Sequence, residues 1–262
     1  MSDVVNVTRN GAILEITLNN PKANTINQPV SRRMGEVFAE FRDDPSLRVA
    51  ILTGAGPKFF SAGWDLNEAA EVGGDGYSAD YGQGGLYGFA ELPGLDKPVI
   101  AAVNGYAVGA GFEILLIADF VVASDNAQMW LPESQLGLMP DVATFLLPRI
   151  LPPVIANEVL FAGRRMTAAE AERWGLFNRV VPQAELMEAA RELAARVVRT
   201  APLSVAGVRQ TIKDSAGLSL AEAYKTMREG GFPAMTRCIT SADAEEGPRA
   251  ALEKREPVWQ GR

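Results

Sequence analysis

Three short runs of the chain contain almost only apolar residues, and they constrain its fold more than any other feature. They are Val49–Thr53, Val99–Val103 and Phe120–Ser124. Helical or turn-rich segments separate them, and strands that are apolar on both sides belong to a sheet with both faces covered. The pattern therefore predicts a mixed α/β core. With 262 residues, 47% of them hydrophobic, the chain can form one large domain with an appendage.

Two further elements are expected before the first of these strands. Residues Val4–Arg9 and Ala12–Leu18 alternate around Asn10-Gly11, a dipeptide suited to a type I′ turn, and predict a β-hairpin. The apolar positions between Pro29 and Phe41 follow helical spacing.

The second half of the chain is helical in pattern. Ala201-Pro202 is the expected boundary, with an α/β core over residues 1–200 and a helical region over 201–262. Glu71–Gly85, rich in Gly, Asp and Tyr, is expected to be a mobile surface loop that serves as a lid. The expected helices are Val154–Phe161, Thr167–Trp174, Gln183–Val198, Leu203–Lys213 and Leu220–Glu229.

Composition excludes several kinds of function. The 25 basic and 32 acidic residues give a net charge of −7, which disfavours nucleic acid and anionic membranes as partners. The single cysteine, Cys238, permits no intramolecular disulfide and fits a reducing compartment. No histidine is present, so Ser-His-Asp and Cys-His catalysis and zinc sites built on imidazole are excluded. Acid–base chemistry must come mainly from Asp, Glu, Lys or Tyr, and no metal site is expected.

Neither a signal peptide nor a membrane span is expected. The N-terminus lacks a basic segment followed by an apolar stretch. The most apolar region, Pro98–Ala123, is interrupted by Asn104, Glu113 and Asp119, so it is typical of buried core. The expectation is a cytoplasmic protein.

One carboxylate occurs in unusually apolar surroundings. Glu113 lies within Gly111–Ala118, where every other residue is apolar or glycine. Burial would raise its pKa toward the range of a general acid or base. The alternatives are a structural carboxylate and an exposed residue on an amphipathic helix.

Two turns could offer free backbone N–H groups. The glycine-rich stretch Gly105–Gly111 leads into the helix that carries Glu113, and it could hold an oxyanion or simply form a tight turn. The second turn is Phe60–Leu66. Further along, Glu133 follows Leu131-Pro132, and Asp141 follows Pro140; a helix start and a helix cap explain these acids equally well.

In combination, these motifs resemble the crotonase (enoyl-CoA hydratase/isomerase) superfamily over essentially the whole chain. The resemblance is carried by Pro21–Asn24, Phe60–Leu66, Lys97–Tyr106, the Glu113 helix, Leu131–Glu133, Leu136-Gly137, Gly163–Met166 and Ala168–Gly175. It is strongest for the branch whose substrate is crotonobetainyl-CoA, through Met34–Phe38, Phe41–Pro45, Ser61–Leu66, Leu151–Pro153 and the tail from Glu246 to Arg262.

The resemblance implies an architecture and a set of roles. It implies a crotonase-like spiral of ββα units, a C-terminal helical trimerisation region, and a homotrimer or dimer of trimers. Glu113 and Glu133 would flank the Cα–Cβ bond of an acyl-CoA, while the backbone N–H groups of Trp64 and Ala110 would bind the thioester oxygen. Residues implied to contact substrate or coenzyme A are Lys22, Ala23, Asn24, Ala62, Gly63, Asp65 and Leu66. No cofactor is implied, because coenzyme A arrives as part of the substrate.

A quaternary ammonium group on the acyl chain would require aromatic faces or a carboxylate nearby. The candidate rings are Trp64, Trp130, Tyr77, Tyr81 and Tyr87, each of which could equally be an ordinary core or loop aromatic.

Two departures from the family pattern keep other functions open. Ala110 stands where the family normally has glycine, and alanine has no easy access to positive φ. The stretch Pro140–Phe145 lacks the Gly-Gly pair of the hydratases and is one residue shorter. With Asp141, the carboxylates Glu113 and Glu133 match the spacing in dienoyl-CoA isomerases, so isomerase chemistry is the first alternative. The second is a non-catalytic binding protein, against which the retained glutamate pair argues.

Overall fold

The computed structural model describes residues 3–72 and 79–262, and these form two compact units. The first contains the described residues up to Leu95 together with Val99–Ala194, and the second contains Asp96–Pro98 and Ala195–Arg262.

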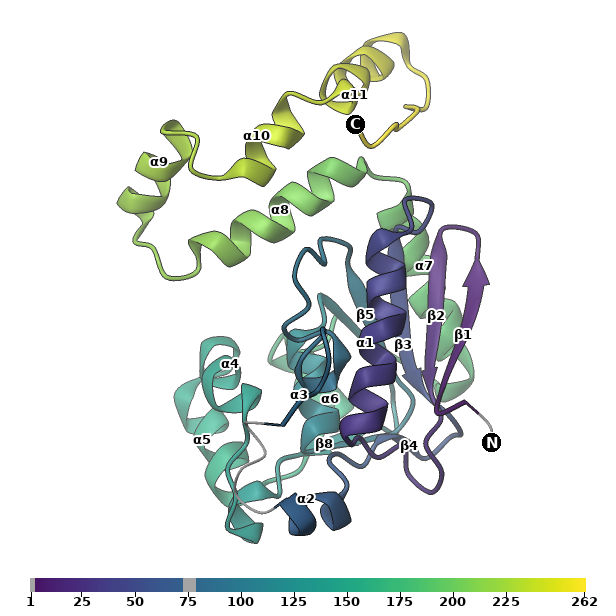
Figure 1. The fold of residues 1–262 in the computed structure, drawn as a ribbon, viewed down its shortest axis with the longest axis vertical. Helices are drawn as coiled ribbons and strands as arrows, with labels where there is room; N and C mark the ends of the chain where they lie inside the picture. Colours follow the sequence, from purple (N-terminus) through teal and green to yellow (C-terminus); the bar gives the residue numbers. More distant parts are fainter. Residues whose placement is uncertain (1–2, 73–78) are drawn as a thin grey trace. The chain divides into compact units, whose positions relative to one another are not determined.

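A six-stranded sheet forms the centre of the first unit (Figure 1). Its spatial order is β1-β2-β3-β5-β7-β10, and every neighbouring pair is parallel except the antiparallel β1 and β2. The strands are β1 Val5–Asn10, β2 Ile13–Leu18, β3 Val49–Gly54, β5 Val99–Val103, β7 Phe120–Ser124 and β10 Arg179–Val181.

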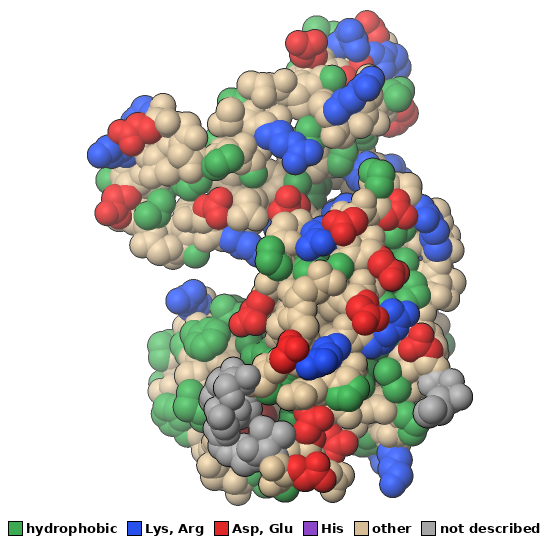
Figure 2. Space-filling model, in the orientation of Figure 1, with side chains coloured by type: hydrophobic (Ala, Val, Ile, Leu, Met, Phe, Trp, Pro, Cys, Tyr) green, Lys and Arg blue, Asp and Glu red, His purple; other side chains and the backbone are tan. Residues whose placement is uncertain are grey.

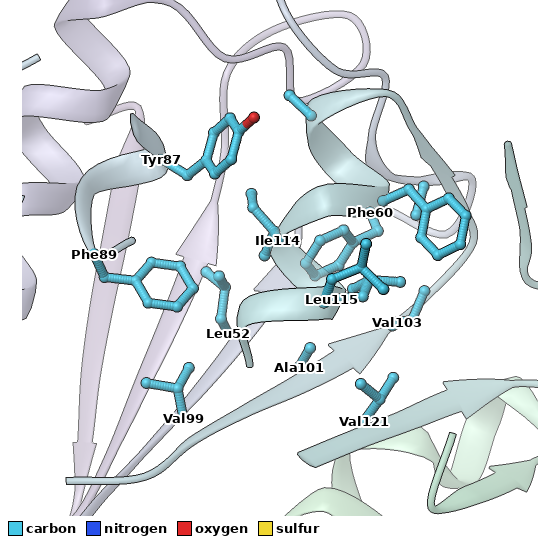
Figure 3. Close-up of a cluster of buried hydrophobic side chains, with 14 of the residues drawn as sticks. Leu52, Phe60, Tyr87, Phe89, Val99, Ala101, Val103, Ile114, Leu115 and Val121 are labelled. Atoms are coloured by element: carbon cyan, nitrogen blue, oxygen red, sulfur yellow. The ribbon is translucent and has the colours of Figure 1, made fainter. Parts of the chain in front are cut away.

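Both faces of this sheet are covered, as its uniformly apolar strands predict. Figure 3 shows one face, where Ile114 and Leu115 of helix α3 (Ala110–Ile117) lie among side chains of β3, β5 and β7. Helix α1 (Gln28–Asp43) lies along the same sheet and begins where the Asn27 side chain accepts a hydrogen bond from the Val30 N–H. On β2, Glu15 pairs with Arg191 of helix α7 (Leu186–Val198) at 2.8 Å.

The predicted hairpin is confirmed, but the expected turn is wrong in position and type. Asn10 and Ile13 are the last paired residues, so Gly11 and Ala12 form the turn. Of the four residues Asn10–Ile13, only Gly11 has a positive φ, +58°. A type I′ turn at Asn10-Gly11 would need positive φ at both of its central positions.

A second, four-stranded sheet was not visible in the sequence pattern. Its order is β4-β6-β8-β9, with strands β4 Phe59–Ser61, β6 Tyr106–Val108, β8 Gln128–Trp130 and β9 Met166–Thr167. Strands of two or three residues are too short to show alternation, so the sequence indicates only turns there. Strands β4 and β6 each lead directly into a turn that carries predicted site residues.

The remaining elements of the first unit are short helices. They are α2 Leu66–Val72, η2 Leu86–Gly88, η3 Glu133–Leu136, α4 Val142–Ile150, α5 Pro153–Ala162, α6 Ala168–Arg173 and η4 Gln183–Glu185. Part of the expected lid Glu71–Gly85, including Tyr77, lies outside the described residues. The end of that segment is not at the surface, because Gly84 and Gly85 are buried.

The second unit is helical. It contains α8 Pro202–Ser215, α9 Leu220–Arg228, α10 Pro233–Ile239 and α11 Ala242–Glu253, of which the sequence predicted the first two. Two buried carboxylates of α11 hold the C-terminal tail. Asp243 accepts hydrogen bonds from the N–H groups of Gln260 and Gly261, at 2.6 and 2.9 Å. Glu246 is bound by Arg255 and Arg249, which hold its pKa well below the ordinary range.

No helix in the described part of the chain combines the length and apolar character needed to cross a bilayer.

The buried Asn104 joins the two sheets and should be important for stability. Its Oδ1 accepts from Gly54 N–H at 3.2 Å, and its Nδ2 donates to the carbonyls of Gly56 and Phe59. Asn104→Ala should lower the free energy of unfolding by about 2–4 kcal/mol, because several buried backbone groups lose their partners. Urea denaturation measures this, with Asn6→Ala on the exposed side of β1 as a control that should change stability by less than about 0.5 kcal/mol. An equal effect of the two substitutions would contradict the assigned role.

Candidate active site

Glu113 is held by hydrogen bonds at both of its carboxylate oxygens. Its side chain lies on the first turn of α3 and its residue is only 2% exposed. Oε2 accepts a hydrogen bond from the Tyr87 hydroxyl, and Oε1 accepts one from the Ala143 N–H at 2.9 Å. The sequence expectation that this acid is buried is confirmed, and the alternative of an exposed position is wrong.

The pKa of Glu113 reflects opposing influences. Burial raises it above the ordinary value, and the negative charge of Asp141 adds to that shift. The Ala143 N–H and the Tyr87 O–H oppose it, because donors stabilise the charged form.

Glu133 has fewer hydrogen-bond partners. It is the first residue of η3, and a Cβ built on Gly109 would lie 2.5 Å from its Oε1, so the carboxylate lies against the turn before α3. Its Oε2 is buried without a partner among the described residues. Burial, reinforced by the charges of Glu113 and Asp141, raises the pKa of Glu133 to about 7. A carboxyl with this pKa can release or accept a proton near neutral pH.

Two backbone turns meet beside these acids. Gly63 has a φ of +89°, and a Cβ added there would lie 2.5 Å from the Val108 carbonyl oxygen and 3.4 Å from the Ala110 nitrogen. Only a residue without a side chain permits this approach. Within residues 3–72 and 79–262, the N–H groups of Trp64 and Ala110 have no hydrogen-bond acceptor. Two unpaired donors on adjoining turns are suited to binding one oxyanion.

Alanine at position 110 does not strain this arrangement. The positive φ, +51°, is at Gly109, and Ala110 begins α3 without a positive φ. The first helical N–H has no partner within its own helix and remains free for a ligand. The departure from glycine therefore leaves the donor in place.

The segments expected to contact coenzyme A lie side by side. Ala62 N–H donates to the Ala23 carbonyl at 2.9 Å, and the Ser61 hydroxyl donates to the Asn24 carbonyl at 2.7 Å. Lys22 is exposed with a φ of +81°. Asn24 is different, because its buried side chain donates to the carbonyls of Ala55 and Phe59 and so stabilises the loop itself.

Helix α4 and the residue before it also contribute to this site. Asp141 lies at the N-cap position of α4, and its charge raises the pKa of both glutamates. Two residues later, the Ala143 N–H reaches Glu113. The stretch that departs from the hydratase pattern thus supplies a negative charge and a hydrogen-bond donor to the same site.

The aromatic residues that were candidates for binding a quaternary ammonium group lie in different surroundings. Trp64 and Tyr81 form an edge-to-face pair with ring centroids 5.4 Å apart. Trp130 is covered on a face by the Arg165 guanidinium at 4.1 Å, so that face is occupied by another cation. Tyr87 is buried and bonded to Glu113, a contact that sequence reasoning missed because nothing in the spacing of positions 87 and 113 indicates it.

The described residues contain no group of three or more His, Cys, Asp or Glu side chains that could hold a metal ion. The site brings together two carboxyl groups with different surroundings and two free backbone donors. Such a set can move protons at one carbon skeleton while it stabilises negative charge on a carbonyl oxygen.

Comparisons with known proteins agree with this chemistry. A family model described as enoyl-CoA hydratase/isomerase matches residues 8–262. The chain is 56% identical over 263 residues to a carnitinyl-CoA dehydratase of Escherichia coli (strain K12) and 54% identical to one of Salmonella heidelberg (strain SL476), with 100% of each chain covered. It is also similar to the crystal structure of an enoyl-CoA hydratase from Bacillus anthracis, with a TM-score of 0.89, 30% identity and coverage of 99% and 100%. For an enoyl-CoA hydratase from Mycobacterium tuberculosis H37Rv the TM-score is 0.88, with 35% identity and 99% coverage of both chains.

Substitutions of Gly109 and Ala110 should show that these two neighbouring small residues have different roles. Gly109→Ala should lower the free energy of unfolding by about 2 kcal/mol or more, because it combines an unfavourable φ with a contact to Glu133 Oε1. Ala110→Gly should cost about 1 kcal/mol or less, the effect of glycine on helix propensity. Urea denaturation of both variants measures the difference. Equal losses would show that the positive φ does not matter at position 109.

Proposed function

Because this chain belongs to the enoyl-CoA hydratase/isomerase family, we propose that it catalyses the reversible hydration of an α,β-unsaturated acyl-CoA thioester, with crotonobetainyl-CoA and carnitinyl-CoA as the reacting pair. The observation that carries the proposal is the contrast between the two glutamates. Glu113 is hydrogen-bonded at both oxygens, whereas Glu133 has a buried oxygen with no partner among the described residues and a pKa raised to about 7. One base and one acid are what the addition of water to a double bond requires.

The backbone donors would stabilise the charge that develops during the reaction. When water attacks Cβ, electron density moves from the double bond to the thioester oxygen and gives an enolate. The N–H groups of Trp64 and Ala110 would bind that oxygen. Loss of one such donor typically costs about 2.7–4 kcal/mol of transition-state stabilisation.

The proton balance assigns different roles to the two glutamates. Ionised Glu113 would take a proton from the attacking water, whose oxygen bonds to Cβ. Protonated Glu133 would then deliver its proton to Cα, so that water has been added across the bond. Transfer of the proton from Glu113 to Glu133 through another water resets the pair. Dehydration follows the same steps in reverse.

Several features support a cationic acyl group. The relatives with 54–56% identity are carnitinyl-CoA dehydratases. The pKa of Tyr81, which pairs with Trp64, is raised by burial and by the negative charges of Glu68 and Asp141. An aromatic pair in a negative field favours a quaternary ammonium group over an uncharged chain.

Isomerisation of an enoyl- or dienoyl-CoA is the alternative reaction. It would use Glu113, Glu133 and Asp141 to move protons between carbons without adding water. The electrostatic coupling of Asp141 to both glutamates is the observation in its favour. A non-catalytic binding role would need no such coupled pair of acids, so it ranks last.

Assembly and coenzyme A binding follow from the family resemblance. We propose a homotrimer or dimer of trimers in the cytoplasm, with Lys22–Asn24 near the adenine of coenzyme A and no additional cofactor. Exposed apolar side chains support self-association. On α4 and α5 they gather on one face of the first unit (Figure 2), and they include Phe145, Ile150, Val154 and Phe161. On α8 and α9 of the second unit they include Val208, Ile212, Leu220 and Tyr224.

Side-by-side hydration of crotonobetainyl-CoA and crotonyl-CoA tests the proposed substrate. We expect a higher kcat/KM for crotonobetainyl-CoA by about 10-fold or more, the scale expected for one cation–π site that is partly desolvated. Loss of the enoyl-thioester absorbance measures both rates. Preference for crotonyl-CoA would contradict the cationic substrate but not the hydration. If neither is hydrated and Asp141→Asn abolishes double-bond migration in a dienoyl-CoA, the isomerase alternative replaces the proposal.

Glu133→Gln should abolish most turnover and yet stabilise the protein at alkaline pH. The native carboxyl keeps its proton up to about pH 7, whereas the unfolded chain releases it near 4.5. Between these values the native state binds more protons, so stability falls as the pH rises. The variant cannot ionise and should gain about 1–3 kcal/mol over the wild type at pH 8 and little at pH 4.5.

Urea denaturation at the two pH values measures this difference. The exposed Glu185 supplies the control, since Glu185→Gln should leave both stability and turnover unchanged. The absence of a pH-dependent gain in Glu133→Gln would contradict the raised pKa. For the wild type, the rate of hydration should fall as the pH rises above about 7, because Glu133 must be protonated.

A further inference from the structure

We propose that Tyr87 is a positioning residue of the hydration site, whose phenolic O–H fixes Glu113 in the orientation and ionisation state needed to activate water. The inference rests on the proposed function and gives Tyr87 a role toward Glu113, in place of the role of a ring that contacts substrate. It begins from one contact: the Tyr87 hydroxyl donates a hydrogen bond to Glu113 Oε2. Both residues are almost completely buried, at 1% and 2% exposure.

The backbone of Tyr87 has an unusual conformation that delivers the hydroxyl. Its φ is +60° and its ψ is +11°, the left-handed region that bulky residues rarely adopt. Such strain persists only where the surrounding structure holds it in place, and it is found most often at functional sites. Figure 3 shows the Tyr87 hydroxyl pointing away from the apolar side chains of Leu52 and Phe89.

The segment that carries Tyr87 is fixed on helix α1. A Cβ added to Gly88 would collide with the Cβ of Met34 and lie 2.6 Å from the Gly35 nitrogen, so the loop backbone touches the helix directly. Phe89 stacks on Phe38 of α1 with ring centroids 4.5 Å apart. Earlier in the sequence, the Asp80 carboxylate is bound by Arg32 of α1 at 3.0 Å. Helix α1 therefore sets the position of the hydroxyl, although α1 contributes no side chain to Glu113.

The groups around Glu113 explain why a neutral donor matters. Tyr87 approaches from η2, the Ala143 N–H and the Asp141 carboxylate come from α4 and its N-cap, and Glu133 lies on η3. The negative charge of Asp141 favours protonation of Glu113. The Tyr87 hydroxyl and the backbone N–H groups of Ala143 and Asp141 oppose this effect, and Tyr87 is the side-chain donor among them.

Tyr87→Phe tests the role because it keeps the ring and removes only the hydroxyl. In the hydration direction Glu113 must be ionised, so the rate rises with pH through its pKa. Loss of the donor should move this acidic limb to higher pH by about one to two units. We expect kcat to fall by about 10- to 100-fold as the carboxylate loses its fixed orientation, with KM within about twofold of the wild type. An unchanged acidic limb together with an unchanged kcat would overturn the proposal.

The matched control is Phe89→Leu in the same buried segment. It disturbs the stacking on Phe38 without touching Glu113, so it should lower thermal stability and leave the pH profile in place. A shift of the acidic limb in this control as large as that of Tyr87→Phe would reduce Tyr87 to a packing role. A ring-fluorinated tyrosine at position 87 keeps the fold and donates more strongly, so it should move the limb to lower pH.

Infrared difference spectroscopy separates this proposal from the proposed function. The carboxyl band that disappears in Glu113→Gln identifies Glu113, and its titration can be followed without substrate. A wild type that hydrates neither acyl-CoA, but whose Glu113 titration shifts in Tyr87→Phe, would contradict the hydration and support the positioning. Active enzyme with the same Glu113 titration in both forms would contradict the positioning alone.

Discussion

The burial of one carboxylate, Glu113, is the constraint on which the organisation of this site depends. Removing a charged carboxylate from water is costly unless hydrogen bonds compensate. Helix α3 places Glu113 at such a position because its other residues are apolar and pack on the sheet. The chain compensates with donors from two distant segments, the hydroxyl of Tyr87 and the N–H of Ala143.

Strand pairing in the four-stranded sheet positions the backbone N–H groups of Trp64 and Ala110. Strands β4 and β6 are parallel neighbours, and each leads into a turn with an N–H group that has no acceptor in the described part of the chain. Since adjacent parallel strands run in the same direction, their following turns meet at one edge. Gly63 lets the turns approach until its missing Cβ would touch the Val108 carbonyl. The two backbone donors proposed to bind the oxyanion are therefore positioned by strand pairing and by one glycine.

Much of the fold could be predicted from the sequence, because long elements have a periodic or uniformly apolar pattern. The strands over Val99–Val103 and Phe120–Ser124 agree with the structure in both bounds. The family resemblance is confirmed, and with it the fold class. The second sheet escaped prediction because its strands have at most three residues, and α11 escaped because Pro248 interrupts its pattern. Glu113 could be identified from its apolar neighbours in the sequence and Glu133 only from the family resemblance, whereas the Tyr87 contact depends on tertiary packing alone.

The absence of histidine from the sequence gives the neutral donors a particular significance. A cation beside the glutamates would lower the pKa of both, since a full charge acts over several ångströms in a buried site. Glu133 would then be ionised at neutral pH and unable to supply a proton. A hydroxyl and an N–H act mainly on the oxygen that they touch. They favour the ionised form of Glu113, while the negative charges of Glu113 and Asp141 still raise the pKa of Glu133. Two chemically identical side chains thereby have different surroundings: Glu113 accepts hydrogen bonds at both oxygens, whereas Glu133 Oε2 has no partner among the described residues.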